Sequence, residues 1–500
     1  MNMKYFVSID AGTHQVKTVL FDVAGHEIED VSVEIDLLQD SIRAEVDMIK
    51  YWNKTAECVR LLLKKSQIDP DRIWAVSVTG QSGGLWALDA YGNPIGNAIL
   101  NVDTRAEMYV KAIQEKTPGV ARLIHRNLGM PIMAGTTLVL LKWLKQNRME
   151  IYSEIAHLFF AKDWIRYCLT GDISTEVTDA GSSFLKISDQ QMVTQVLTIL
   201  EIEEAQNWLP TIKKSSEIAA ILNVPASEKT GLNAGTPVIV GATATATASF
   251  GMGAIKEDDL AINLDTTCTI SVVQKQKNCD YTHYYYHYLK HCIEGNVLNI
   301  KHCCNGMESI RFVAREIART ANRQMIESMV NASDPGANGV VFHPYLALEG
   351  EVMPFANENA RASFFGISEA TTKNDLLRAA YEGVAYAIKD CLGTSQNSNT
   401  ILLSGEGAKS MALCQMIADV TGIRVVTSVG QEMSGRGAAM LAGVGVGVYD
   451  NFETAVRKCC KINRMYQPHN LEIYDKTFVL YNELRLAYNH LWNRRVEILG

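Results

Sequence analysis

Hydrophobic and β-branched residues near the N-terminus predict two β-strands separated by a short polar turn. The strands cover 5–9 and 16–21, and the turn between them reads Asp10-Ala11-Gly12-Thr13-His14-Gln15. Two such runs on either side of a turn are typical of a β-hairpin. The same pattern of strand, short Thr-rich turn and strand recurs at 261–273. Two hairpins about half a chain apart predict two similar lobes.

Between and beyond the hairpins, apolar residues at helical spacing alternate with short continuous apolar runs. The continuous runs are typical of buried parallel strands, and two of them end in glycine-rich turns at 80–84 and 405–407. Such strand ends are where α/β folds bind ligands, so the pattern predicts an α/β fold. Helices are expected at 46–64, 136–147, 411–421 and 435–447, and strands at 72–79, 85–89 and 401–404.

One long run, 237–255, has no charged residue over 19 positions and has to be checked as a membrane span. It is rich in Gly, Ala and Thr rather than in Leu. A buried strand followed by a turn is therefore the better interpretation of this run.

Composition and charge describe an ordinary globular protein. The 500 residues suffice for two or three domains, and 47% are hydrophobic and 20% charged. The net charge of −8 argues against non-specific nucleic-acid binding. The eleven cysteines, with no signal peptide in the sequence, indicate reduced thiols in a cytoplasmic protein. The adjacent pairs Cys303-Cys304 and Cys459-Cys460 lack C-x-x-C spacing, so structural thiols are expected rather than a zinc site.

The first hairpin turn has the chemistry of a phosphate site. Gly12 can adopt positive φ and lets the backbone approach a ligand closely. Thr13 adds a hydroxyl, and successive N–H groups in such a turn form a concavity that suits an anion. Asp10, at the end of the first strand, is placed to hold hydrated Mg²⁺. An ordinary turn remains the alternative interpretation.

Several longer motifs identify the family. Residues 162–171 read K-D-W-I-R-Y-C-L-T-G, and 175–181 read T-E-V-T-D-A-G. A P-Y-L segment at 344–346 is followed by N-A-R at 359–361, and 382–386 read E-G-V-A-Y. In these motifs and in both hairpins, the chain resembles the FGGY family of carbohydrate kinases, which belongs to the actin and hexokinase superfamily. The resemblance covers nearly the whole chain.

The resemblance implies a fold, and it assigns different binding functions to the two halves of the chain. The fold is α/β, with two ribonuclease-H-like lobes of the actin/hexokinase type and a cleft between them. Residues 1–253 form the N-terminal lobe with the sugar site and the first phosphate hairpin, and residues 254–500 form the nucleotide-binding lobe. Nucleotide and phosphate contacts are implied at Gly12, Thr13, Thr266, Thr267, Gly405, Glu406, Gly407 and Lys409, with Asp10 as metal ligand and catalytic residue.

Sugar contacts are implied at the glycine-rich turn after strand 72–79. Several members of the family carry bulky or charged residues where this chain has Ser82 and Gly83. Gln81 is then the side chain best suited to hydrogen-bond a sugar hydroxyl. An ordinary glycine turn remains the alternative.

A second sugar contact is implied in a segment that resembles the family's W-x-D-x-R, with Asn101 in place of the tryptophan. Asp103 is the expected ligand, because a carboxylate accepts two hydroxyl bonds and rejects analogues that lack them. The alternative is that Asp103 pairs with Arg105 or caps a helix that begins at Arg105.

The most consequential departure from the family pattern is Ala244. The family has an aspartate at this position, which acts as general base for the sugar hydroxyl, and no acidic residue lies between Asn233 and Lys256. A methyl group cannot accept a proton, and loss of a general base typically costs about 10²–10⁴-fold in rate. Asp103 or Asp179 is expected to substitute only if the sugar binds in an unusual way.

Three further departures affect the same cleft. Asp265 replaces a glycine that faces the transferring phosphate, where two like charges at roughly 4–5 Å would cost about 3–4 kcal/mol. Asp265 could instead be a metal ligand. Glu406 brings a second carboxylate to the glycine loop, and Val352 stands where arginine is usual.

Two functional hypotheses follow. The first is an ATP- and Mg²⁺-dependent kinase that transfers the γ-phosphate to a small ketose or polyol, xylulose-like, with impaired turnover. The second is a pseudokinase that binds sugar or nucleotide for sensing or assembly. The expected partners are a small sugar and ATP, with neither nucleic acid nor membrane, and a homodimer is left open. The lobes are expected to close when ligands bind.

Overall fold

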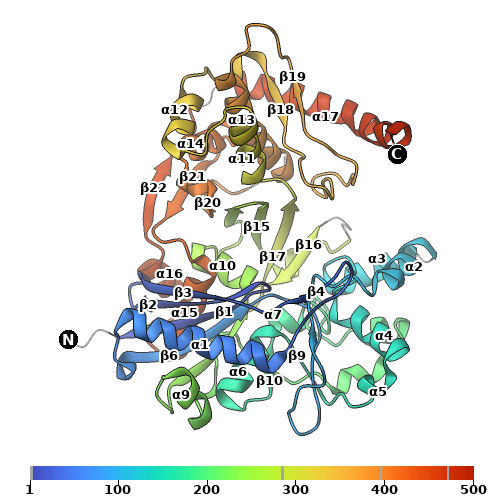
Figure 1. Cartoon of the computed structure of the whole chain (residues 1–500), viewed down its shortest axis with the longest axis vertical. Helices are drawn as coiled ribbons and strands as arrows, with labels where there is room; N and C mark the ends of the chain where they lie inside the picture. The colour runs from blue at the N-terminus through green and yellow to red at the C-terminus, as the bar shows by residue number, and fades with distance from the viewer. Residues whose placement is uncertain (1–3, 117, 283–285, 394–396, 470–471, 500) are drawn as a thin grey trace. The chain divides into compact units, whose positions relative to one another are not determined.

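The computed structural model describes residues 4–116, 118–282, 286–393, 397–469 and 472–499 (Figure 1). Two compact units are present, and neither is one continuous stretch of chain. The first unit contains Met1–Glu257, Val273–Asn299 and Glu432–Lys461. The second unit contains Asp258–Val272, Ile300–Gln431 and Ile462–Gly500. The predicted division at 253/254 lies four residues before the first change of unit, but two later segments return to the first unit.

The elements alternate between strands and helices, as an α/β fold requires. The N-terminal half contains β1 Tyr5–Ala11, β2 Gln15–Asp22, β3 Glu27–Glu34, β4 Leu38–Gln39, β5 Ala44–Val46, α1 Met48–Ser66, β6 Ile73–Gly80, β7 Trp86–Leu88, β8 Ala98–Ile99, α2 Glu107–Lys116, α3 Pro118–Leu128, α4 Thr137–Asn147, α5 Met149–Tyr152, β9 His157–Phe159, α6 Ala161–Thr170, β10 Ser174–Glu176, α7 Val177–Ala180, α8 Thr194–Ile199, β11 Thr211–Lys213, β12 Ile218–Ile221, α9 Val224–Thr230, β13 Pro237–Thr243 and α10 Ala244–Met252.

The C-terminal half contains β14 Leu260–Leu264, β15 Cys268–Lys275, β16 His287–Lys290, β17 Asn296–Cys303, α11 Met307–Glu316, α12 Arg323–Asn331, β18 Val341–His343, β19 Ser363–Phe365, α13 Lys373–Leu392, β20 Thr400–Ser404, α14 Met411–Thr421, β21 Arg424–Ser428, α15 Met433–Gly445, α16 Phe452–Cys459, β22 Ile462–Tyr466 and α17 Glu472–Leu499.

The main sheet of the first unit has the strand order β12-β13-β6-β1-β2-β3. β1 and β2 form the predicted hairpin, with Tyr5 opposite Asp22 and Ala11 opposite Val16. β6 pairs with β1 in parallel, and β13 pairs with β6 in parallel. The sheet therefore places the carboxyl ends of β1, β6 and β13 at one edge.

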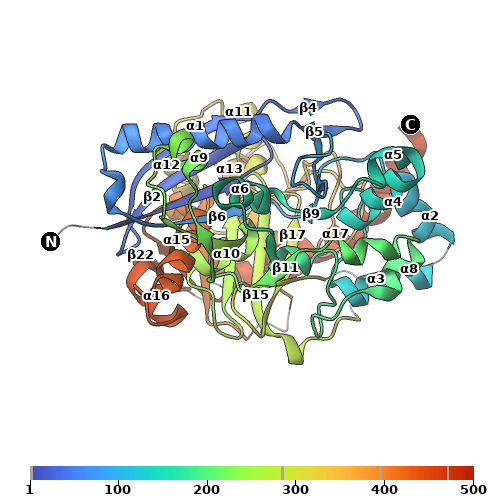
Figure 2. The same ribbon diagram turned by 90° about the horizontal axis from the view of Figure 1, so that it is seen from below.

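Side-chain alternation along β1 assigns its residues to the two faces of the sheet. Tyr5, Val7 and Ile9 belong to a core shared with α1, α6 and α9. α15 packs on β1, β6 and β13, and α10 packs on α15 (Figures 1 and 2). Asp10 follows Ile9 and therefore points to the opposite face of the sheet, where its carboxylate accepts a hydrogen bond from Ser434 of α15. The final small-residue helix thus completes the first unit rather than the nucleotide lobe to which the sequence assigned it.

The second unit repeats this strand arrangement. Its sheet has the order β16-β17-β15-β14-β20-β21-β22, in which β14 and β15 form the second predicted hairpin. β20 pairs in parallel with β14, and β21 pairs in parallel with β20. α13 packs against α11, α12 and α14. The capping box of Thr372 and Asp375 starts α13, because each side chain accepts a hydrogen bond from the backbone N–H of the other residue.

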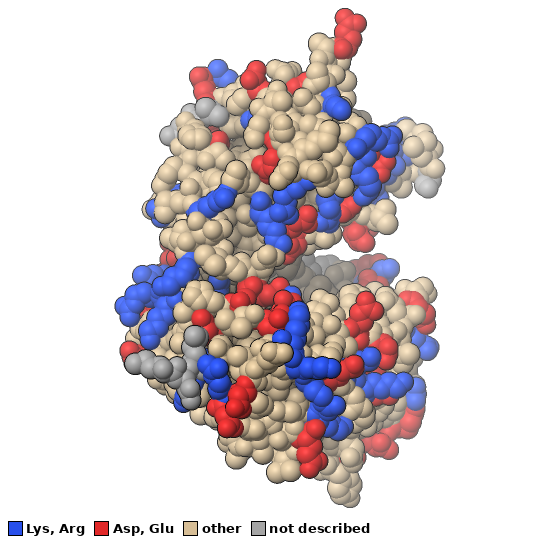
Figure 3. Space-filling view, turned by 60° about the vertical axis from the view of Figure 1, so that its left-hand side comes forward, with Lys and Arg blue, Asp and Glu red and all other residues tan. Residues whose placement is uncertain are grey.

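The structure confirms most predicted elements and changes one. The stretch 237–255 contains β13, as expected, but a helix, α10, follows in place of the predicted turn. Ala and Thr in alternation give no clear 3.6-residue apolar pattern, because small residues occupy both the buried face of α10 and its partly exposed face at 244, 245 and 248. Among the described residues, no helix is long and apolar enough to cross a membrane. On the face drawn in Figure 3, basic and acidic side chains are interspersed, and neither sign dominates.

The K-D motif forms a fully buried charge cluster that joins α6 to α7. Lys162 Nζ lies 2.6 Å from Asp163 Oδ1, 3.1 Å from Asp179 Oδ2 and 3.4 Å from Glu176 Oε1. Arg166 Nη1 donates to Asp163 Oδ1 at 2.8 Å. Burial raises the pKa of Asp179 to about 8, so this carboxyl is protonated at neutral pH. Two cations then face two carboxylates, and the buried charges balance.

Replacing Lys162 with methionine should destabilise the first unit strongly. The substitution keeps most of the side-chain volume but leaves two buried carboxylates with one cation, which should lower the free energy of unfolding by about 3–5 kcal/mol. Urea denaturation at pH 7 measures this loss. The exposed Lys64→Met variant in α1 is the control and should stay within about 0.5 kcal/mol of the original chain. A loss below about 1 kcal/mol for Lys162→Met would contradict the role given to this lysine.

Candidate functional site

The pairing of three parallel strands brings the predicted residues of the first unit together. Ala11 is opposite Gly80 in the β1–β6 pair, and Gly80 is opposite Thr243 in the β6–β13 pair. Gly12, Gln81 and Ala244 each follow this row by one residue. Three distant parts of the chain therefore meet at the carboxyl edge of the sheet, where α/β folds bind ligands.

Asp10 lies one residue before this row in a partly enclosed environment. Ser434 Oγ donates a hydrogen bond to Asp10 Oδ2 at 3.1 Å. Burial, with a smaller contribution from the Glu432 carboxylate, raises the pKa of Asp10 to about 6, while the hydrogen bond from Ser434 and the charge of Lys17 oppose the shift. A desolvated carboxylate with few donors is suited to a hard cation. In the described part of the chain, no group of three or more His, Cys, Asp or Glu could hold a metal. Asp10 would therefore bind Mg²⁺ together with water and phosphate oxygens.

The turn after β1 and the turn after β6 are joined by one side-chain hydrogen bond. Thr13 Oγ1 donates to Gln81 Oε1 at 2.8 Å, and Gln81 N donates to Ala11 O at 3.0 Å. Gly12 is required here, because a Cβ at this position would lie 2.5 Å from Gln15 O. Gln81 Nε2 is buried and has no hydrogen-bond partner among the described residues. Buried amide groups normally have partners, so this N–H donor is available to a ligand hydroxyl.

The remaining residues of the predicted sugar turn have clear positions. Ser82 Oγ donates to Ser182 Oγ at 3.3 Å, which connects the turn to the segment after α7. Gly83 and Gly84 both have left-handed φ, +77° and +74°. A side chain at Gly84 would meet Ile99 O at 2.6 Å. Gln81 and Ser82 therefore lie on the turn that follows the carboxyl end of β6, and this turn requires glycine at 83 and 84.

Asp103 is engaged in the ion pair that the sequence left as an alternative. Arg105 donates to Asp103 through Nε at 2.9 Å and through Nη2 at 2.7 Å, and Ala44 N donates to Asp103 Oδ2 at 2.8 Å. Arg105 Nη2 also donates to Glu45 Oε1 at 2.6 Å. The Asp103 side chain is buried, and α2 begins at Glu107 rather than at Arg105. A direct contact between Asp103 and a sugar stays a prediction.

Ala244 is the first residue of α10 and is partly exposed. Next to it, Thr243 N donates to Thr178 Oγ1 at 2.9 Å, and Thr178 Oγ1 donates to Glu176 Oε1 at 2.5 Å. Glu176 and Asp179 are both fully buried, and Asp179 lies against Lys162. Neither carboxylate is presented at the surface where a substrate hydroxyl would bind. The position of the family's base therefore has no acidic replacement from α7.

Asp265, in the second unit, bonds to the glycine loop. Its Oδ1 accepts from Glu406 N at 2.7 Å, and its Oδ2 accepts from Asn263 Nδ2 at 2.9 Å. Gly405 has φ +83°, and a Cβ there would lie 2.8 Å from Asp265 Oδ1. Asp265 therefore ties the turn after β14 to the turn after β20, a role that the sequence did not reveal.

A cavity of about 480 Å³ lies beside these two turns in the second unit. Volumes of this size hold small ligands. Its apolar wall includes Ile310, Ala314 and Ile326, and Tyr381 and Ser410 supply hydroxyl groups. Of the residues predicted for the nucleotide, Glu406 lines the cavity, whereas Lys409 is exposed next to Ser410. The nucleotide site predicted from the glycine loop thus has a cavity at that loop.

Arg311 is a charged residue of this cavity that sequence reasoning missed, as are Arg315 and Arg323. The Arg311 guanidinium forms an ion pair with Glu406, donates to Thr266 Oγ1 at 3.1 Å, and lies 2.8 Å from Glu308 Oε2. The Glu406 carboxylate therefore has a cationic partner in this structure. No motif marks these arginines, because α11 and α12 reach the cavity through tertiary packing.

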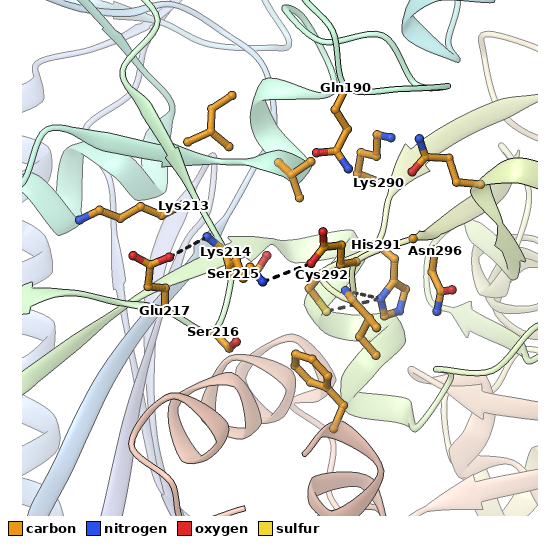
Figure 4. Close-up of a pocket in the computed structure, with 17 residues that line it drawn as sticks. Gln190, Lys213, Lys214, Ser215, Ser216, Glu217, Lys290, His291, Cys292 and Asn296 are labelled. Carbon is orange, nitrogen blue, oxygen red and sulfur yellow. Dashed lines mark hydrogen bonds and ion pairs between the residues drawn. The ribbon is translucent and has the colours of Figure 1, made fainter. Parts of the chain in front are cut away.

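A different cavity of about 530 Å³ lies in the first unit between 212–217 and 290–296 (Figure 4). None of the predicted site residues lines it. Its buried polar side chains already have partners: Ser215 Oγ donates to Glu176 Oε2 at 3.0 Å, and Lys290 Nζ donates to Ile187 O at 2.6 Å. The predicted site residues of the first unit therefore lie outside this cavity, and their contacts with ligands stay predictions.

Comparison with known proteins agrees with this geometry. Residues 5–251 match the N-terminal domain, and residues 260–446 the C-terminal domain, of the FGGY family of carbohydrate kinases. A xylulose kinase of Staphylococcus epidermidis is 27% identical over 96% of each chain. An erythritol kinase of Brucella abortus is 26% identical over 98% of this chain and 97% of its own. The crystal structure of ligand-bound xylulose kinase from Lactobacillus acidophilus has a TM-score of 0.87 at 26% identity and covers 98% of this chain and 99% of its own.

The raised pKa of Asp10 predicts a pH-dependent stability. The folded chain holds this proton up to about pH 6, whereas the unfolded chain loses it near pH 3.8. The free energy of unfolding should therefore fall as the pH rises from about 4 to 6, by about 1–3 kcal/mol from this group. In Asp10→Asn this fall should be absent. Urea denaturation at pH 4 and pH 7 measures the difference, with the exposed Asp36→Asn as control. Parallel profiles for Asp10→Asn and the original chain would contradict the assignment.

The Arg311–Glu406 ion pair predicts the effect of removing the acidic side chain. In Glu406→Ala, Arg311 keeps only Glu308 as an acidic partner among the described residues, and one carboxylate leaves the cavity. We expect the dissociation constant for ATP, measured by isothermal titration, to fall about 3–10-fold, equivalent to about 0.7–1.4 kcal/mol. The matched control is Glu316→Ala, in the last turn of α11 and exposed. Weaker binding by Glu406→Ala would show that this carboxylate itself contacts the nucleotide.

Proposed function

The chain belongs to the FGGY family of carbohydrate kinases, and we propose that it transfers the γ-phosphate of ATP to a hydroxyl of a small ketose or polyol. The observation that carries the proposal is the row of Gly12, Gln81 and Ala244 at the carboxyl edge of three parallel strands. In this proposal Gly12 belongs to the phosphate turn, Gln81 supplies an amide donor, and Ala244 occupies the base position, so all three serve one reaction. Relatives named xylulose kinase and erythritol kinase support the substrate class.

ATP binds in the second unit in this proposal. The apolar wall at Ile310 and Ile326 accommodates the base, and Glu406 of the turn at 405–407 lies at the cavity. The turn at 265–267 reaches the same cavity through the bond between Thr266 and Arg311. Arg311 is within hydrogen-bond distance of Thr266 and supplies positive charge there. Bound Mg²⁺ neutralises phosphate charge during transfer, and Asp10 is the residue of the first unit that would hold it.

The sugar binds at the edge of the first sheet. Gln81 Nε2 donates to a substrate hydroxyl, since it has no other partner in the described part of the chain. The hydroxyl that attacks the phosphate must lose a proton, and Ala244 cannot accept it. We therefore propose that turnover is slower than in a chain with an acid at this position, by about 10²–10⁴-fold. We propose that the reaction takes place in the cytoplasm. Whether the chain forms a homodimer stays an open prediction.

A second candidate function is a pseudokinase. The observation that favours it is the alanine at the base position, together with the full burial of Glu176 and Asp179, whose segment bonds to Thr243 through Thr178. In this case ATP or sugar binding, rather than phosphate transfer, is the biological event.

The decisive experiment measures ADP release over a panel of pentuloses, pentoses and polyols, for the original chain and for Ala244→Asp. The first turn of a helix tolerates an acidic residue well, so the variant should fold. We expect about 10²–10³-fold faster release from Ala244→Asp with the correct substrate. Ala244→Asn is the matched control, because it has the same size and no base.

Each outcome decides between the two candidates. Ordinary turnover by the original chain would show that another group acts as the base. Equal rates for Ala244→Asp and Ala244→Asn, with ATP still bound in a titration, would favour the pseudokinase.

A further inference from the structure

Three buried cysteines meet behind the hairpin turn of the second unit. Cys268 is the first residue of β15, Cys303 is the last residue of β17, and Cys391 lies in the last turn of α13. Their exposed fractions are 1%, 2% and 3%. Cys303 Sγ lies 2.9 Å from Cys391 Sγ, and all three are free thiols in this structure. We call these residues the thiol cluster.

The spacing of the thiol cluster favours a covalent bond over a metal site. Two thiolates bound to one tetrahedral Zn²⁺ at about 2.3 Å are about 3.8 Å apart, which is farther than Cys303 and Cys391. The described residues offer no cluster of metal ligands. A disulfide has an S–S length of about 2.05 Å, so the two sulfur atoms need to approach by about 0.9 Å.

The three thiols differ in reactivity because of their contacts. Hydrogen bonds from Cys268 and Cys391 lower the pKa of the Cys303 thiol well below its usual value. The same contacts, together with burial, raise the pKa of Cys268 and of Cys391. The thiolate is the nucleophile in thiol oxidation, so Cys303 reacts first and a neighbour completes the bond.

The thiol cluster is connected to the nucleotide cavity through a short stretch of backbone. Cys303 is followed by the segment that starts α11, in which Met307 N donates to Asp265 O at 2.8 Å. Gly306 packs against the hairpin turn so closely that a Cβ would lie 2.7 Å from Asp265 O. Met307 and Arg311 of α11 line the cavity. A bond that moves Cys303 therefore acts on the first turn of α11.

The strand that carries Cys303 is tied to the helix end that carries Cys391. Lys301 Nζ of β17 donates to the carbonyl oxygens of Cys391 at 2.7 Å and Leu392 at 3.2 Å. Lys301 is two residues before Cys303, so this contact keeps the two thiols close, and closing the remaining gap between the sulfur atoms shifts Cys303, which lies next to the segment that starts α11.

We propose that Cys303 and Cys391 form a reversible disulfide that lowers the affinity of the second unit for ATP. The consequence for ATP rests on the proposed function, whereas the bond itself does not. The oxidant is a small hydroperoxide, because thiols at most 3% exposed exclude a bulky one.

The oxidation balances in two steps. The Cys303 thiolate attacks the peroxide, whose O–O bond breaks, and with one proton this gives a sulfenic acid and water. Cys391 sulfur then displaces the sulfenic oxygen, which leaves as water as the S–S bond forms. In total, two thiols and one hydrogen peroxide give one disulfide and two waters, and two electrons pass from sulfur to oxygen.

The test treats the full chain with hydrogen peroxide and maps disulfides by mass spectrometry of peptides under non-reducing conditions. We expect a peptide pair linked through Cys303 and Cys391 that dithiothreitol separates. The pair should be absent in Cys303→Ser and Cys391→Ser. Cys58→Ser, which removes a buried thiol of the first unit, is the matched control and should keep the link. No link, or a link through Cys268, would overturn the assignment.

A second measurement tests the consequence. After oxidation, ATP should bind at least about 5-fold more weakly by titration, and hydrogen exchange in 304–312 should change. Both effects should reverse with dithiothreitol and be absent in Cys391→Ser. If the disulfide is mapped in the oxidised chain but the ATP affinity and the hydrogen exchange of 304–312 do not change, the proposed effect of the disulfide on ATP binding is wrong. If ATP binds neither form, the proposed function fails, and the linked peptide and the exchange data still decide whether the bond forms and moves α11.

Discussion

The parallel pairing of β1, β6 and β13 is the constraint on which the first unit's site depends. The buried apolar side chains of these strands fix the pairing register. This register places Ala11, Gly80 and Thr243 side by side on neighbouring strands. A slip of one residue in β1 would turn Asp10 from Ser434 into the core formed with α1 and α6. The chemistry resides in the residues that follow the strands, but its geometry is set by the apolar side chains within them.

In the second unit, the two acidic departures from the family pattern have partners within the chain. Asp265 accepts from Glu406 N, and the side chain of Glu406 forms an ion pair with Arg311. The repulsion expected for Asp265 assumed a carboxylate with no partner, whereas this one accepts two hydrogen bonds. The acids therefore do not by themselves indicate a lost nucleotide site. Ala244 is different, because a methyl group cannot accept a proton and the nearby carboxyl groups of Glu176 and Asp179 are fully buried.

Sequence reasoning predicted the elements that local pattern determines. Both hairpins, the strand 72–79 and the helices at 46–64, 136–147 and 411–421 are confirmed, because period-2 and period-3.6 patterns reflect burial on one face. It missed what depends on distant contacts. The return of 432–461 to the first unit and the bond between Asp265 and the glycine loop join segments whose proximity only the folded chain defines. The pairing of Asp103 with Arg105 is local, and it was one of the alternatives that the sequence offered.

Stability does not explain the alanine at 244. The residue opens α10, where an acidic side chain would favour the helix by about 0.3–1 kcal/mol through the dipole. An aspartate there would be partly exposed and would cost little desolvation. The fold therefore gives no reason to exclude an acid, while Gln81 at the same edge keeps an amide donor without a partner among the described residues. In the proposed function, ligand binding and proton removal would therefore depend on different residues at this edge of the sheet, Gln81 and the residue at 244.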